Sequence, residues 1–168
     1  MSQITGYVFF YSHRNGTPED VLSQFYPSSF TVQGITFPTS EHYMHYQKAV
    51  MFCDTATAQK ILSTSDPSEA KKLGRRVRPF NGQVWDDRSM QIVYDANMAK
   101  FTQNPKLLEI ITSIRYQGKF FVEASPYDKI WGIGMRQSEA RTLQPSQWKG
   151  QNKLGRVLTA VRDNIIMK

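Results

Sequence analysis

Residues 38–49 of this 168-residue chain read Pro-Thr-Ser-Glu-His-Tyr-Met-His-Tyr-Gln-Lys-Ala, and they predict the start of the helix around which the chain is organised. Thr39 or Ser40 is suited to the N-cap position, because a hydroxyl there accepts a hydrogen bond from the first turn. Glu41 then lies in that first turn, where its charge favours the helix dipole. The stretch therefore predicts a helix with an acidic residue at its beginning.

Three ionisable residues of this helix share one face. At about 100° per residue, Glu41, His45 and Lys48 lie within about 60° of one another. Spacing alone favours a capping glutamate with an ordinary charge pair on a solvated face. The apolar residues on either side of the stripe indicate the wall of a pocket instead, so both interpretations stay open at this point.

Length and composition indicate a globular protein with a sizeable core. Hydrophobic residues make up 40% of the chain and aromatic residues 12%, which excludes general disorder. No apolar run approaches the ~20 residues that span a bilayer, and we expect no signal peptide. The single cysteine, Cys53, excludes an intramolecular disulfide and any multi-cysteine zinc site. We expect a cytoplasmic protein.

The net charge is +7, from 21 Lys and Arg against 14 Asp and Glu. Such a charge suits DNA, RNA or a small molecule that bears phosphate. The densest basic cluster spans residues 71–78, and cations at a helix end also simply favour the dipole. No aromatic residue interleaves with that cluster as in a stacking platform, so a general nucleic-acid binder is the least favoured reading. The three histidines have no recognisable metal-ligand spacing. His42 and His45, three residues apart, are able to ligate a metal, but packing in a Tyr-rich helix is favoured, so we expect no metal, and we expect no cofactor.

The remaining patterns predict one α+β domain over residues 1–168, mostly helical, with a small sheet or hairpins. Strong local signals include an N-cap at Asp66 followed by Pro67, and Gly74 as a natural C′ residue near which that helix stops. The predicted strands are residues 7–11, 30–32, 35–37 and 119–124. The predicted helices are residues 38–49, 55–62, 66–74, 85–103 and 105–112 and one that begins after Asn152; residues 125–147 are predicted to be a long loop.

Seven polar or aromatic residues are left unexplained by packing or turns. They lie at the ends of predicted elements or in the glycine-rich loop: Glu41, Lys48, Arg75, Glu123, Asp128, Trp131 and Asn152. Two carboxylates divide general-acid and general-base work when their environments differ. A desolvated lysine serves as a nucleophile or an electrostatic clamp, and tryptophan and arginine suit a base and a phosphate. This inventory is typical of glycosidic or nucleotide chemistry.

The order of several motifs resembles the NADAR (NAD and ADP-ribose) superfamily, which includes the YbiA-like N-glycosidases. The motifs are Ser-Glu-His-Tyr at residues 40–43, Asp-x-x-Trp-Gly-x-Gly at residues 128–134 and Gly-x-Asn-x-Leu-Gly at residues 150–155. The resemblance covers almost the whole chain, and the shared order of the motifs is more specific than any one of them. Gln24 departs from the asparagine that the family usually has there, and His45 from a glutamine. These departures bear on substrate choice more than on reaction type.

The resemblance implies a small α+β enzyme that hydrolyses an N-glycosidic bond to ribose. One branch of the family acts on ribosylamino-pyrimidine phosphates of riboflavin synthesis, and another removes ADP-ribose from guanine in nucleic acid. By position, the reacting groups are Glu41, Lys48 and Asp128. The residues implied to bind substrate are Gln24, Arg75, Trp85, Glu123, Trp131, Gly132 and Asn152. His45 has no role in this reading, because packing explains it.

The partners implied are a ribosyl phosphate or ADP-ribose, with ADP-ribosylated DNA or RNA as a macromolecular alternative. We expect a monomer that does not engage a membrane. A rival of another class is a non-catalytic module that binds NAD or ADP-ribose without turnover.

Overall fold

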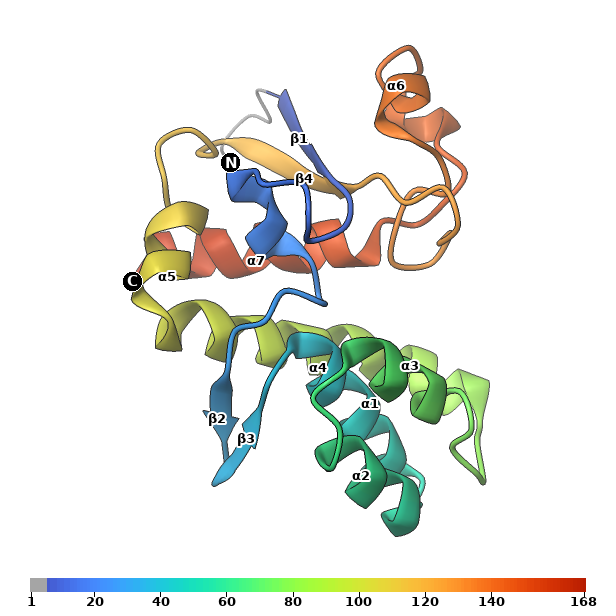
Figure 1. Cartoon of the computed structure of the whole chain (residues 1–168). Coiled ribbons are helices and arrows are strands. Elements are labelled where there is room, and N and C mark those ends of the chain that lie inside the picture. Colours follow the sequence, from blue (N-terminus) through green and yellow to red (C-terminus); the bar gives the residue numbers. More distant parts are fainter. Residues whose placement is uncertain (1–5) are drawn as a thin grey trace. The chain divides into compact units, whose positions relative to one another are not determined.

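The computed structural model describes residues 6–168 (Figure 1). The chain forms two compact units. The central unit is Gln24–Leu107. The terminal unit consists of residues 6–23 and Leu108–Lys168. About half of the chain is helical, and the strands form two sheets of two strands each. The predicted α+β class is therefore confirmed, whereas the single domain over residues 1–168 stays a prediction.

The central unit contains a hairpin and four helices, and α1 packs against the other three (Figure 1). Their bounds are β2 Phe30–Val32, β3 Ile35–Phe37, α1 Ser40–Met51, α2 Thr55–Leu62, α3 Pro67–Gly74 and α4 Gly82–Gln103. Ala49 of α1, Ile61 of α2 and Ala70 of α3 are fully buried in one cluster. Phe37 and Tyr43 form a second cluster with rings 5.0 Å apart, edge to face.

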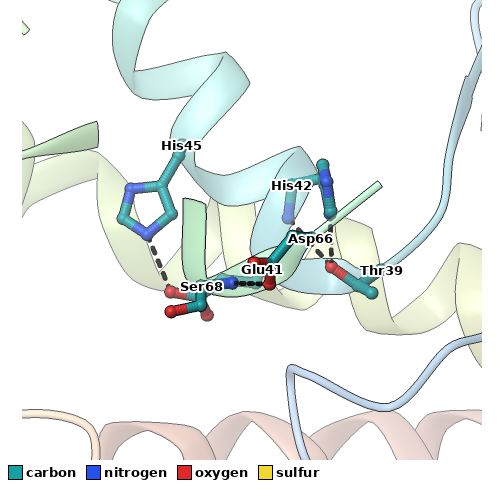
Figure 2. Close-up of polar contacts among 6 residues, drawn as sticks. All are labelled: Thr39, Glu41, His42, His45, Asp66 and Ser68. Carbon is teal, nitrogen blue, oxygen red and sulfur yellow. Dashed lines mark hydrogen bonds and ion pairs between the residues drawn. The ribbon is translucent and has the colours of Figure 1, made fainter. Parts of the chain in front are cut away.

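Side-chain caps decide where these helices begin. Thr39 Oγ1 accepts a hydrogen bond from His42 N at 3.2 Å, so Thr39 is the N-cap of α1. Asp66 is the N-cap of α3, as predicted, and accepts from Ser68 N at 2.9 Å (Figure 2). The prediction that α4 begins at Trp85 is wrong by three residues. Asn81 accepts from Val84 N at 3.1 Å and starts the helix earlier.

The predicted hairpin is confirmed with the same strand bounds. Val32 pairs with Ile35 and Phe30 with Phe37. The two turn residues, Gln33 and Gly34, have φ of 50° and 80°. Positive φ at both turn residues matches the right-handed twist of the flanking strands, which is why a glycine in the second position suits this turn.

The terminal unit is built on a parallel strand pair that the sequence did not predict. Strand β1 (Gly6–Phe10) pairs with β4 (Lys119–Glu123) in the register Val8 to Phe121 and Phe10 to Glu123. Helix α7 (Lys153–Ile166) packs against β4 (Figure 1). Arg162 of α7 is fully buried, donates to Tyr116 O at 2.6 Å and lies over the ring of Phe121. Its charge is thus satisfied inside the core.

Shorter elements complete the chain. Helix α5 is Pro105–Ile111, close to the prediction, and a 3₁₀ helix occupies Pro18–Leu22. The prediction of an uninterrupted loop over residues 125–147 is wrong, because α6 (Gln137–Ala140) and a second 3₁₀ helix (Pro145–Gln147) lie within it. Within residues 6–168, none of the helices combines the length and the apolar character needed to cross a bilayer.

Candidate functional site

The predicted residues of the central unit begin with Glu41 in the first turn of α1. Glu41 and His45 are only 5% and 6% exposed, and His45 Nε2 lies 2.7 Å from Glu41 Oε1 (Figure 2). The carboxylate is an acceptor, so Nε2 carries the proton of this hydrogen bond. Glu41 is therefore not on a solvated face, and the interpretation as an exposed capping residue is wrong.

The imidazole of His45 is fixed from its other side by Gly74. A Cβ added at Gly74 would overlap the His45 ring, so only glycine fits there with the ring in this position. Gly74 is the last residue of α3, and the C-cap is Arg75 in a right-handed conformation. The helix ends near Gly74 as predicted, but Gly74 is its last residue rather than the C′ residue, and glycine is required there for space. His45 Nδ1 is buried and has no hydrogen-bond partner among residues 6–168.

His42 of α1 uses both ring nitrogens in hydrogen bonds to neighbouring residues. Its Nε2 donates to Thr64 O at 2.8 Å, and its Nδ1 lies 2.7 Å from the hydroxyl of Thr39 (Figure 2). Burial lowers the pKa of His42, which favours the neutral ring that this pattern needs. In the described chain, no three His, Cys, Asp or Glu residues are gathered in a way that could hold a metal ion.

Lys48 lies two turns after Glu41 and faces aromatic rings. Its Nζ is 4.7 Å from the centre of the Phe80 ring and 5.6 Å from that of Trp85. Burial lowers the pKa of Lys48, and the charges of Arg78 and Arg75 lower it further. A larger fraction of neutral amine suits a nucleophile. Arg75 is exposed, so its guanidinium is accessible to a phosphate.

Gln24 is joined to the first turn of α1. Its backbone carbonyl accepts from Glu41 N at 3.1 Å, and its Oε1 accepts from Asn97 Nδ2 at 3.0 Å. Gln24 Nε2 is buried and has no partner among the described residues. The fold of the central unit thus places Gln24 next to Glu41. It also places Trp85 and Arg75 near Lys48.

The terminal unit carries the other predicted residues, beginning with Asp128. One carboxylate oxygen of Asp128 accepts from Ile130 N at 2.9 Å and from Trp131 N at 2.8 Å. The Asp128 carbonyl accepts from Gly134 N at 3.0 Å. Asp128 therefore shapes the loop that presents Trp131, and it does so with one of its two oxygens.

Asn152 binds the edge of β4 with both ends of its amide. Its Oδ1 accepts from Glu123 N at 2.9 Å, and its Nδ2 donates to Phe121 O at 3.0 Å. This geometry needs the left-handed backbone of Asn152, with φ of 52°. Asn152 thus acts on the strand that carries Glu123, a role that its position in the sequence did not reveal.

Gly132 lies where two backbone segments meet. A Cβ there would stand 2.9 Å from the Asp128 carbonyl and 3.0 Å from that of Glu123. The Gly132 carbonyl accepts from Asn152 N at 3.0 Å. In the next residues, Lys153 N donates to Ile130 O and Leu154 N to Trp131 O, each at 3.1 Å. The loop therefore caps the beginning of α7 with its own carbonyls.

The comparisons identify the family. The NADAR domain family matches residues 9–166, and the chain belongs to this family. A protein of Acanthamoeba polyphaga mimivirus named N-glycosidase R617 is 39% identical over 163 residues, which cover 94% of this chain and 95% of that protein. A Vibrio vulnificus riboflavin biosynthesis protein, VVA0006, is 31% identical over 86% of this chain, but the match covers only 35% of that protein.

A solved structure agrees with this assignment. The NMR structure of the E. coli protein YbiA covers 99% of this chain and 88% of its own, with a TM-score of 0.77 and 29% sequence identity. The resemblance to the NADAR superfamily and the YbiA-like fold are thereby confirmed. The roles given to individual residues stay predictions, and His45 is the residue that the sequence interpretation set aside although it contacts Glu41.

Proposed function

We propose that this chain is an N-glycosidase that hydrolyses the bond between a base and the ribose of a phosphorylated or ADP-ribosylated substrate. The main support for this proposal is the match to the NADAR domain over residues 9–166, together with the 39% identity to a protein named N-glycosidase. A hydrolase acting on N-glycosyl bonds is the activity that family membership supports.

In the proposed reaction the C–N bond breaks with positive charge developing at the anomeric carbon. A carboxylate, Glu41 or Asp128, stabilises that charge or orients the attacking water. Water adds to the anomeric carbon, and the base leaves with a proton. His45 holds one oxygen of Glu41 at 2.7 Å, which fixes the carboxylate for either role.

Lys48 offers a second route, in which its amine attacks the aldehyde of an opened ribose and forms a Schiff base. The lowered pKa of Lys48 supports this route, because only the neutral amine is nucleophilic. Borohydride reduces a Schiff base to a stable amine. An adduct on Lys48 after reduction in the presence of substrate supports this route, and turnover without any adduct excludes it.

The substrate is proposed within two classes, a ribosylamino-pyrimidine phosphate and ADP-ribosylated guanine in DNA or RNA. Each is incubated with the protein and with the Glu41→Gln variant, and the freed base is measured by mass spectrometry. We expect base from one class and at least ~10²-fold less from the variant. Saturable binding with no base from either class would replace this proposal with a non-catalytic NAD- or ADP-ribose-binding module.

A further inference from the structure

A separate cleft lies wholly within the terminal unit. It has a volume of about 790 Å³, and it is lined by residues 7–11 and by residues of four later segments, 15–19, 115–119, 124–127 and 136–141. None of the ten predicted site residues lines it. The lining reaches Ala124, Pro126 and Tyr127, directly before Asp128, so the cleft borders the loop of the predicted site.

The charges that line this cleft are predominantly positive. Four cationic side chains line it, against the single carboxylate of Glu19; the four are Arg115, Lys119, Arg136 and Arg141. Arg115, Arg136 and Arg141 are exposed. Burial raises the pKa of the Tyr116 phenol, and the negative charge of Glu19 nearby raises it further. The cleft therefore favours an anion with several charges.

Aromatic rings lie among these cations. Tyr7 and Phe9 alternate along β1 and so project from one face of the strand, about 6.6 Å apart along its axis, and Tyr11 directly follows the strand. Tyr7 and Phe9 pack edge to face on Trp148, at 5.3 and 5.9 Å between ring centres. Tyr127 also lines the cleft and is 82% exposed. Tyr7 and Tyr11, 42% and 44% exposed, also line the cleft, so exposed rings and cations share one surface.

We propose that this cleft binds single-stranded nucleic acid, with the arginines and lysine on the phosphates and the tyrosines stacked on bases. Rings and cations in one groove are the elements that recognise unpaired strands, since every base offers a face for stacking. A duplex hides its bases from the tyrosines, and a peptide offers neither repeated phosphates nor bases. The proposal does not depend on N-glycosidase activity, because it concerns binding of unmodified strands.

The fold creates this surface from residues scattered in the sequence. The cationic residues Arg115, Lys119, Arg136 and Arg141 belong to no basic run. The aromatic residues come from positions 7–11, 116 and 127. These four residues contribute to the net charge of +7, and none of them belongs to the basic cluster at residues 71–78.

Fluorescence anisotropy with a fluorescein-labelled 12-mer of unmodified dT tests the proposal. We expect log K to fall with log salt concentration with a slope of about −2 to −3, as for three or four neutralised phosphates. Tyr127→Ala should weaken binding by about fivefold or more, and Tyr127→Phe, which keeps the ring, should restore it. Arg136→Ala should weaken binding and lower the slope by about 1, whereas the exposed Arg156, which does not line the cleft, serves as the matched control.

Three results would overturn the proposal. The first is absence of binding at low salt, and the second is equal affinity for a 12-base-pair duplex. The third is an equal loss in Arg136→Ala and Arg156→Ala with no effect of Tyr127→Ala, which would reduce the interaction to net charge. Melting temperatures of all variants confirm that each compared protein is folded.

Discussion

His45 Nε2 lies 2.7 Å from Glu41 Oε1, one helical turn away, and both side chains are almost fully buried. A buried carboxylate that loses its donor keeps its desolvation cost. The hydrogen bond therefore links the stability of α1 to the orientation of a proposed catalytic group.

The first prediction concerns His45 as a positioning residue. His45→Ala leaves Glu41 without this donor, and we expect it to lower both turnover and the free energy of unfolding, the latter by about 1–3 kcal/mol. The measurements are kcat, with whichever proposed substrate class releases base, and the free energy of unfolding from urea denaturation. His45→Gln keeps a donor and should recover most of the turnover. A His45→Ala protein with unchanged kcat would show that His45 serves packing only.

The second prediction uses the space at Gly74. Gly74→Ala places a methyl group into the His45 ring, so we expect it to destabilise the protein by about 1–3 kcal/mol. Gly82→Ala is the matched control, because the nearest atom to its added Cβ is Phe80 Cε1 at 4.0 Å. Urea denaturation should show the control unchanged or up to about 1 kcal/mol more stable. Equal stability of the two variants would contradict the packing described here.

The third prediction concerns the amine of Lys48. Removing the positive charge of Arg78 in Arg78→Ala should raise the pKa of Lys48, because a like charge disfavours the ammonium. The neutral amine then appears at higher pH, and acetylation of Lys48 by acetic anhydride near neutral pH becomes slower. Peptide mass spectrometry across a pH series gives the midpoint. Arg76→Ala, also at an exposed arginine, is the control, and an equal midpoint in both variants would refute the coupling.

The fourth prediction concerns Lys100, which is 0% exposed and whose pKa burial lowers to about 7. An unfolded lysine has a pKa of about 10.4. Between about pH 7 and 10 the unfolded chain therefore binds more protons than the folded protein, and stability from this group rises with pH by up to about 1.4 kcal/mol per unit. This stability is lost as the pH falls towards 7.

Lys100→Met should remove that rise, which urea denaturation at pH 7, 8 and 9 measures. The exposed Lys106 provides the control substitution, Lys106→Met, which should retain the slope of the unaltered protein. If Lys100→Met keeps the full slope, another group causes it.

The fifth prediction separates the two features of Asn152. Asn152→Gly keeps the left-handed backbone but loses both hydrogen bonds to β4, which should cost about 2–4 kcal/mol for two buried backbone groups. Asn152→Ala loses the same bonds and adds the strain of positive φ, so it should be about 1 kcal/mol less stable still. Urea denaturation compares the two. An alanine variant as stable as the glycine variant would show that φ carries no cost here.

Local signals explain which elements could be predicted. The hairpin, α2 and α3 were predicted with their bounds, or within one residue of them, because turn residues and caps such as Asp66 act on their immediate neighbours. The pairing of β1 with β4 could not be predicted, since nothing near either strand specifies a partner so distant in the chain. Helix α6 is too short to produce a periodic pattern.

The candidate site was predictable as a set of residue types but not as a set of contacts. Glu41 and Lys48 could be placed on one helix face from spacing alone. The contact of His45 with Gly74 depends on how α3 packs on α1, and the bonds of Asn152 depend on a strand about thirty residues earlier. Sequence therefore suggested Asn152 as a ligand for substrate, whereas its amide binds the β4 backbone.

The capping of α7 by the carbonyls of Ile130 and Trp131 has a consequence for motion. A loop that supplies the terminal hydrogen bonds of a helix opens only when the helix end frays with it. Amide hydrogens of Lys153 and Leu154 should therefore exchange with solvent at the same rate as those of the loop at residues 130–134, as one cooperative segment. We therefore expect the segment that presents Trp131 to open only together with the first turn of α7.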